Sequence, residues 1–199
     1  IFLTIFVNLI GFGIIIPLMP FYAESFGASP LTIGLLFAMF SLCQLLAAPA
    51  LGDLSDRYGR RPILVFSLVG TVVSFVMLAT ATSITMLFLA RIVDGLSGGN
   101  ISTARAYVAD VTEPKDRARA YGLIGAAFGL GFVIGPLIGG LLGSFGPRVP
   151  FLVAAALSLL NFLYGFFILP ESLSKENVRK FDWKRANPLG TLRQLYRYP

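Results

Sequence analysis

Six long apolar stretches dominate the sequence and dictate what kind of fold it can adopt. A helix that crosses a lipid bilayer needs about 20 mostly apolar residues. Stretches of this length recur along the chain, separated by short segments rich in glycine, proline, serine or charged residues. They lie near Ile1–Met19, Leu31–Leu51, Pro62–Ala81, Ile84–Ala109, Ala120–Leu142 and Val149–Leu169. The sequence therefore predicts an all-α membrane protein with six transmembrane helices.

The composition agrees with this prediction and excludes several classes of function. Hydrophobic residues make up 56% of the chain and charged residues 13%, whereas soluble domains average about 45–50% and about 25%. The absence of histidine excludes imidazole catalysis and histidine-ligated metal sites, and the single Cys43 excludes a disulfide or a thiolate cluster. No nucleophile–base pair or phosphate-binding loop stands out, so an integral-membrane enzyme has no support. We expect no metal and no cofactor.

The basic residues predict how the six helices are oriented. The net charge of +6 comes from 16 lysines and arginines against 10 acids. Cytoplasmic loops of membrane proteins collect lysine and arginine, and the first, third and fifth loops here hold only Arg148. The second loop, the fourth loop and the tail carry Arg57, Arg60, Arg61, Lys115, Arg117, Arg119, Lys175, Arg179, Lys180, Lys184, Arg185, Arg193 and Arg197. We therefore expect a multi-pass protein of the cell (inner or plasma) membrane, in contact with lipid, with both ends cytoplasmic and no nucleic-acid partner.

An internal repeat relates the two halves of this pattern. Pro49–Arg61 and Pro136–Arg148 align at an offset of 87 residues. The matched pairs are Pro49 with Pro136, Gly52 with Gly139, Leu54 with Leu141, Tyr58 with Phe145, Gly59 with Gly146 and Arg61 with Arg148. The same offset aligns the second apolar stretch with the fifth and the third with the sixth. Each repeat then holds three helices, and an odd number means that the second copy is inverted in the membrane.

The loop after the second stretch, GDLSDRYGRR, carries the strongest motif. Its glycines suit a tight turn, and Asp56 can cap a helix or pair with a following arginine. The run closely resembles motif A of the major facilitator superfamily, through Gly52, Asp56, Arg57, Gly59, Arg60 and Arg61. The resemblance implies a cytoplasmic latch whose arginine reaches Asp110, at the end of the fourth stretch, and whose acid meets the other half of the protein. A solvated turn that merely obeys the charge rule is the alternative.

The fifth stretch contains GLGFVIGPLIGG, which resembles motif C, described for antiporters of the same superfamily. Its candidate residues are Gly131, Gly135, Pro136, Gly139 and Gly140. Three of the glycines recur every four residues and form a smooth ridge that lets two helices approach closely, and the proline permits a kink. Tight packing without a role in gating is the alternative.

Further motifs extend the resemblance over nearly the whole chain. Arg91 followed by Gly95 and Gly98 resembles motif B, and the phrases Ala109–Thr112 and Leu169–Ser172 look like the drug-exporting branch that includes the tetracycline exporters. Members of this family have twelve spans in two halves, with the substrate site between them. We therefore expect residues 1–169 to be an N-terminal six-helix bundle, cut from a longer chain. Residues 170–199 would begin a cytoplasmic linker to a missing C-terminal six-helix half.

The fourth stretch carries the ionisable residues of the spans, which by default mark a function because they are costly in a membrane. At helical spacing, Arg91, Asp94, Ser102 and Arg105 share one face. Asp94 follows Arg91 by three residues, close enough to pair. We hypothesise that Asp94 exchanges a proton and that Arg91 tunes its affinity, although a structural pair remains possible. Arg105 lies near the helix end and can instead extend its charge to the membrane surface.

Polar residues at mid-membrane depth complete the predicted substrate cavity. The candidates are Asn8, Gln44, Ser102, Arg105 and Asn161. A neutral amide in a span can equally be satisfied by a neighbouring helix. The tetracycline exporters carry acids at the positions that match Asn8 and Ser74, and this sequence does not.

Together these features predict a secondary active transporter. The preferred function is proton-coupled efflux, by antiport and alternating access, of drugs or other small lipophilic molecules. An organic-anion transporter is the first alternative, because Arg91 and Arg105 outnumber Asp94 within the spans. A non-transporting subunit of a larger membrane complex is the second.

Overall fold

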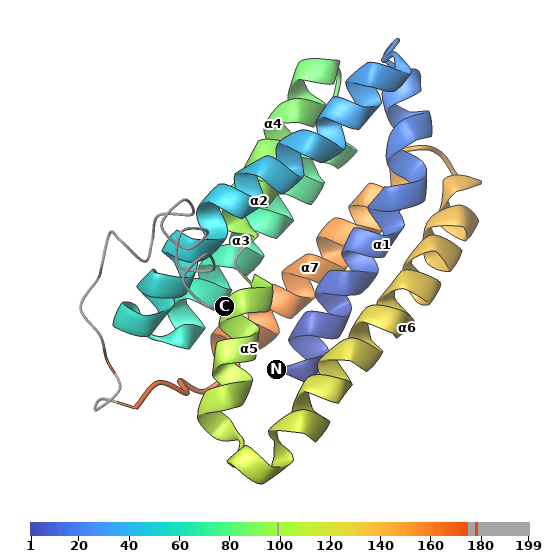
Figure 1. The fold of residues 1–199 in the computed structure, drawn as a ribbon. Helices are drawn as coiled ribbons and strands as arrows, with labels where there is room; N and C mark the ends of the chain where they lie inside the picture. The colour runs from blue at the N-terminus through green and yellow to red at the C-terminus, as the bar shows by residue number, and fades with distance from the viewer. Residues whose placement is uncertain (99, 175–177, 179–199) are drawn as a thin grey trace, which may run out of the picture.

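The computed structural model describes residues 1–98, 100–174 and 178, and this part of the chain is helical without a β-strand. The helices are α1 (Phe2–Glu24), α2 (Pro30–Tyr58), α3 (Arg60–Ala79), α4 (Ile84–Ser97), α5 (Asn100–Val111), α6 (Arg117–Gly143) and α7 (Val149–Phe167), with a short 3₁₀ turn, η1 (Pro114–Asp116). They form one elongated bundle, in which α5 extends from the end of α4 (Figure 1). Most of the predicted linker, residues 175–177 and 179–199, lies outside the described residues.

Five of the helices are long and apolar enough to cross a membrane: α1, α2, α3, α6 together with η1, and α7. The prediction of one continuous fourth helix over Ile84–Ala109 was wrong. Helix α4 ends at Ser97, because glycine at position 98 supports a helix poorly and its carbonyl accepts a hydrogen bond from the Gln44 side chain at 3.2 Å. Helices α4 and α5, of 14 and 12 residues, make the fourth crossing together.

Local signals set the helix ends. Ser29 caps α2 by accepting from the Thr32 amide at 3.2 Å, and a proline opens the helix. Ser83 caps α4 in the same way through the Met86 amide. Helix α2 ends, and α3 begins, at Gly59, whose φ of +107° is a conformation that other residues rarely adopt.

The packing of the helices repeats after three spans, which confirms the inverted repeat. Helix α1 packs on α6 as α2 packs on α4, and α1 contacts α7 as α3 contacts α4. The two central helices, α3 and α7, pack on each other. One wall of the bundle is therefore the α1–α6 pair and the other is the α2–α4 pair, with α3 and α7 between them (Figure 1).

A pair of buried hydrogen bonds shows the same repeat at atomic level. The Ser74 hydroxyl of α3 donates to the Ala90 carbonyl of α4 at 2.9 Å. The Asn161 amide of α7 donates to the Thr4 carbonyl of α1, also at 2.9 Å. Positions 74 and 161 differ by the 87 residues of the sequence repeat. Each central helix is thus fastened to the first helix of the other repeat.

The bundle has two distinct ends. The latch face is the end with the α2–α3 turn, the end of α5 and the residues after α7; the opposite face is the end with the α1–α2, α3–α4 and α6–α7 turns (Figure 1). At the latch face the Tyr107 hydroxyl donates to the Pro170 carbonyl at 3.1 Å. At the opposite face the Tyr22 hydroxyl donates to the Leu78 carbonyl at 3.0 Å.

Candidate functional site

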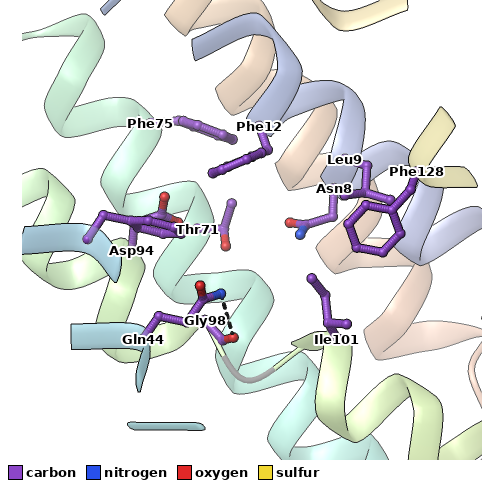
Figure 2. Close-up of a pocket in the computed structure, with 11 residues that line it drawn as sticks. Asn8, Leu9, Phe12, Gln44, Thr71, Phe75, Asp94, Gly98, Ile101 and Phe128 are labelled. Atoms are coloured by element: carbon purple, nitrogen blue, oxygen red, sulfur yellow. Dashed lines mark hydrogen bonds between the residues drawn. The ribbon is translucent and has the colours of Figure 1, made fainter. Parts of the chain in front are cut away.

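A cavity of about 220 Å³ lies between the two walls of the bundle. Figure 2 shows side chains from both walls pointing toward it. Its lining is Asn8, Leu9, Phe12, Phe40, Gln44, Thr71, Phe75, Asp94, Gly98, Ile101 and Phe128. Four phenylalanines and two aliphatic residues make most of the surface apolar, and Asp94 is the only ionisable residue in this lining. Such a site, mostly apolar with a few convergent polar groups, is typical of small-molecule binding.

The Asp94 carboxylate is paired inside the bundle. A terminal guanidinium nitrogen of Arg91 lies 3.1 Å from a carboxylate oxygen, and the two side chains are 1% and 8% exposed. The guanidinium also lies 3.5 Å from the Ser74 hydroxyl and 5.4 Å from the centre of the Phe40 ring. Its Nε has no hydrogen-bond partner. Of these two residues only Asp94 lines the cavity, and Arg91 contacts it from the side away from the cavity.

Four of the five predicted cavity residues line one of two cavities. Asn8 and Gln44 line this cavity, although Gln44 already donates to the Gly98 carbonyl (Figure 2). Ser102 and Arg105 line a second cavity of about 710 Å³, which shares Gln44, Gly98 and Ile101 with the first and reaches Gly52 at the latch face.

Asn161 lies apart from both cavities. The residue is 4% exposed, and its side-chain nitrogen donates to the Thr4 carbonyl of α1, while its Oδ1 is buried without a hydrogen-bond partner in the described part of the chain. The described residues contain no group of three or more histidine, cysteine, aspartate or glutamate side chains that could hold a metal ion.

The glycines of the motif C segment face α1 at very short range. A Cβ atom added to Gly135 would lie 2.6 Å from the Gly13 Cα, and one added to Gly131 would lie 2.7 Å from the Leu9 Cβ. Gly139 faces Ile14 and Leu18 with slightly more room. Gly140 has nothing within 4 Å. The ridge therefore consists of Gly131, Gly135 and Gly139. Gly13 on α1 leaves room for their close approach, and the sequence of the fifth stretch alone does not reveal this partner.

Arg60 organises the latch face. Its Nε lies 2.9 Å from Asp110 Oδ2, and its Nη1 donates to both the Ser55 hydroxyl at 2.7 Å and the Asp56 carboxylate. The Arg60 side chain is 9% exposed, whereas those of Asp56 and Asp110 are 29% and 19% exposed, so the guanidinium is shielded from water and its acids are only partly so. One arginine thus joins the end of α2, the start of α3 and the end of α5. Neighbouring Arg57 is exposed and lies over the Tyr58 ring.

Glu171 is a member of this cluster that the sequence interpretation did not select. Its carboxylate accepts from the backbone amides of Arg60 at 2.8 Å and Arg61 at 3.2 Å, the first residues of α3. It also accepts from the amides of Ser172 and Leu173. The α3 terminus is therefore capped by a residue more than 100 positions away. The LPES phrase was visible in the sequence, but its spatial partner was not.

Comparisons with known proteins agree with this geometry. The model of the Major Facilitator Superfamily matches residues 1–199. Tetracycline resistance protein class C of Escherichia coli is 40% identical over 196 residues, which cover 96% of this chain and 48% of that protein. Multidrug resistance protein 2 of Bacillus subtilis is 39% identical, covering 87% of this chain and 44% of that protein.

Solved structures show the same fold. The crystal structure of the human organic anion transporter MFSD10 (TETRAN) superposes with a TM-score of 0.84 at 29% identity, covering 96% of this chain and 53% of that one. The chain spans about half the length of the curated relatives it matches. With its apolar helices, inverted repeats, Arg60 cluster and glycine ridge, this multi-pass membrane chain belongs to the Major Facilitator Superfamily.

Proposed function

We propose that this chain is the N-terminal half of a proton-coupled exporter of small lipophilic molecules. The observation that carries the proposal is the cavity in which one carboxylate, Asp94, faces an otherwise aromatic and aliphatic lining. Planar apolar molecules can stack on the phenylalanine rings. The carboxylate provides a site that a proton or a positively charged group can occupy in turn. The relatives named for tetracycline and multidrug resistance support the same class of function.

The arrangement favours cationic or neutral substrates over organic anions. The solved relative named as an organic anion transporter keeps this alternative open. In this chain, however, the Arg91 charge is paired with Asp94 and does not line the central cavity. Arg105 lines the second cavity, toward the latch face. An anion bound among the phenylalanines would therefore meet a carboxylate without a free cation beside it.

The Asp94–Arg91 pair supplies a means of coupling. A proton delivered to the Asp94 carboxylate neutralises it and weakens its attraction to Arg91 and to a cationic substrate. Loss of the proton restores both. Because the pair is buried in the wall of the cavity, binding of substrate and binding of the proton compete for one group. Exchange of one for the other is antiport.

We place the latch face in the cytoplasm, with both ends of the chain on that side of a bacterial inner membrane. The basic residues of the α2–α3 turn and of the α5–α6 connection gather at that end, as the positive-inside rule requires. The substrate site would be completed by a second six-helix half, joined through a linker that begins after α7. Membrane lipid, substrate and protons are then the partners, and no enzymatic step is involved.

Proteoliposomes that contain the full-length protein test the proposal. An imposed proton gradient should drive accumulation of the lipophilic cation ethidium, and competing lipophilic cations should inhibit it more than lipophilic anions of similar size. Asp94→Asn should abolish the dependence on the gradient. Glu24→Gln, at an exposed acid of the opposite face, should leave it unchanged. Unaltered coupling in Asp94→Asn, or preferential inhibition by anions, would contradict the proposal.

A further inference from the structure

The α6–α7 turn repeats the geometry of the α2–α3 turn at the other end of the bundle. Gly59 and Gly146, which differ by the 87 residues of the repeat, have φ values of +107° and +131°. Residues with a side chain rarely adopt either conformation. The shared backbone therefore reflects a common turn that the inverted repeat places on opposite faces.

An arginine follows each glycine by two residues and donates to a carbonyl at or near the end of the other central helix. Arg61 Nη2 donates to the Phe166 carbonyl, in the last turn of α7. Arg148 Nη2 donates to the Ala81 carbonyl at 2.8 Å, just beyond the end of α3. Helices α3 and α7 are themselves counterparts in the repeat. Carbonyls at the end of a helix lack partners within it and attract positive charge, so an arginine suits both places.

The acids that surround the first turn have no counterparts around the second. At the offset of 87, Asp56 corresponds to Gly143 and Asp110 corresponds to Ala23. Arg60, which joins those two acids, corresponds to Pro147. The latch face thus has both the ion pairs of Arg60 and the hydrogen bond from Arg61 to Phe166. Of these two features, the opposite face has the counterpart of the second, the hydrogen bond from Arg148 to Ala81.

Each of these two hydrogen bonds joins an end of α3 to an end of α7, the central helices that lie between the two walls. Arg148 follows α6, which belongs to the α1–α6 wall, and Ala81 leads into α4, which belongs to the α2–α4 wall. Arg61 opens α3 directly after α2, and its acceptor ends α7, which packs on α1. The two hydrogen bonds therefore join the ends of the central helices α3 and α7 at opposite faces, where the chain passes between these helices and the walls.

We propose that Arg148 is a positioning residue that fixes the separation of α3 and α7, and with them of the helices that flank the cavity, at the opposite face, as the counterpart of Arg61 at the latch face. Its effect is local to one end of the bundle. A residue that served only to set topology by charge, or only to stabilise the whole fold, would not act at one end alone. The proposal concerns the bundle itself and does not depend on which substrate is carried.

Spin labels at two symmetry-related pairs of positions test this assignment. Thr80 and Phe145 are exposed at the opposite face, and Tyr58 and Phe167 are exposed at the latch face. The same offset of 87 relates Tyr58 to Phe145 and Thr80 to Phe167. Labels are attached in a cysteine-free version of the full-length protein, and electron–electron distances are measured by pulsed spectroscopy. The two pairs are thus matched controls for each other.

Arg148→Ala should shift the Thr80–Phe145 distances to longer values and broaden their distribution, and leave the Tyr58–Phe167 distances unchanged. Arg61→Ala should do the reverse. If Arg148→Ala is not recovered folded, Arg148→Met keeps a long side chain without donors and carries the same expectation. An unchanged Thr80–Phe145 distribution, or equal changes in both pairs, would overturn the proposal.

Discussion

Arg91 and Asp94 form an ion pair one turn apart on α4, with 3.1 Å between the nearest nitrogen and oxygen and almost no exposure of either side chain. Two opposite charges inside the bundle are tolerable because each compensates the other. The carboxylate nevertheless faces the cavity, so the pair can serve both stability and transport. These two roles make different predictions and can be separated by substitution.

Asp94→Asn should destabilise the protein because it leaves the Arg91 charge buried without a partner. Removal of one member of a buried pair costs about 3–5 kcal/mol. The double variant Arg91→Met with Asp94→Asn removes both charges and should recover most of this stability. Thermal unfolding in detergent measures the difference, and ethidium transport measures coupling in the same preparations.

The coupling hypothesis requires that the stable double variant still fails to respond to a proton gradient. Glu24→Gln again serves as the control for loss of an acid. Recovery of coupled transport together with stability would show that the pair is structural and that the proton is carried elsewhere.

Gly135→Ala should separate α6 from α1. The added methyl would lie 2.6 Å from the Gly13 Cα, closer than atoms can approach, and backbone cannot move aside as a flexible side chain would. Overpacking of this kind costs about 1–3 kcal/mol. Gly140→Ala, on the same helix with nothing within 4 Å, is the matched control and should be neutral or slightly stabilising. Equal melting temperatures for the two variants would refute the role of the ridge.

Arg60→Lys should impair transport while leaving the protein in the membrane. Lysine keeps the charge but cannot reproduce the guanidinium contacts that reach Ser55, Asp56 and Asp110 together. Loss of one charge-assisted hydrogen bond costs about 1.5–3 kcal/mol, so a transport rate lower by roughly 10- to 150-fold is expected. Asp56→Asn should act in the same direction.

Arg57→Lys provides the comparison within the same motif. The Arg57 side chain is exposed and contacts the Tyr58 ring rather than an acid of the latch, so its substitution should have little effect. A similar loss of transport in both arginine variants would mean that the motif acts through its total charge.

The sequence predicted the spans and their repeat because both depend on patterns that are local in the chain. Apolar length identifies a span wherever it lies, and the 87-residue offset survives in single residues such as Gly59 and Gly146. The break after Ser97 was missed, because a glycine inside an apolar run is tolerated unless something competes for its carbonyl. That competitor is Gln44, which is distant in sequence. The sequence left the place of Asn161 open between a cavity and a neighbouring helix for the same reason, since its hydrogen-bond partner is on α1.

Glu171→Ala should weaken the start of α3. The carboxylate accepts from the first two amides of α3, and loss of a helix cap costs about 0.5–2 kcal/mol. Glu171→Gln keeps an acceptor but loses the favourable charge at the helix start, worth about 0.3–1 kcal/mol, so it should lie between wild type and Glu171→Ala in thermal unfolding. Glu113→Ala is the control, because its exposed pair with Lys115 contributes little. If Glu171→Ala and Glu113→Ala unfold at the same temperature, the cap does not stabilise α3, and Arg60 is held in place by its acids alone.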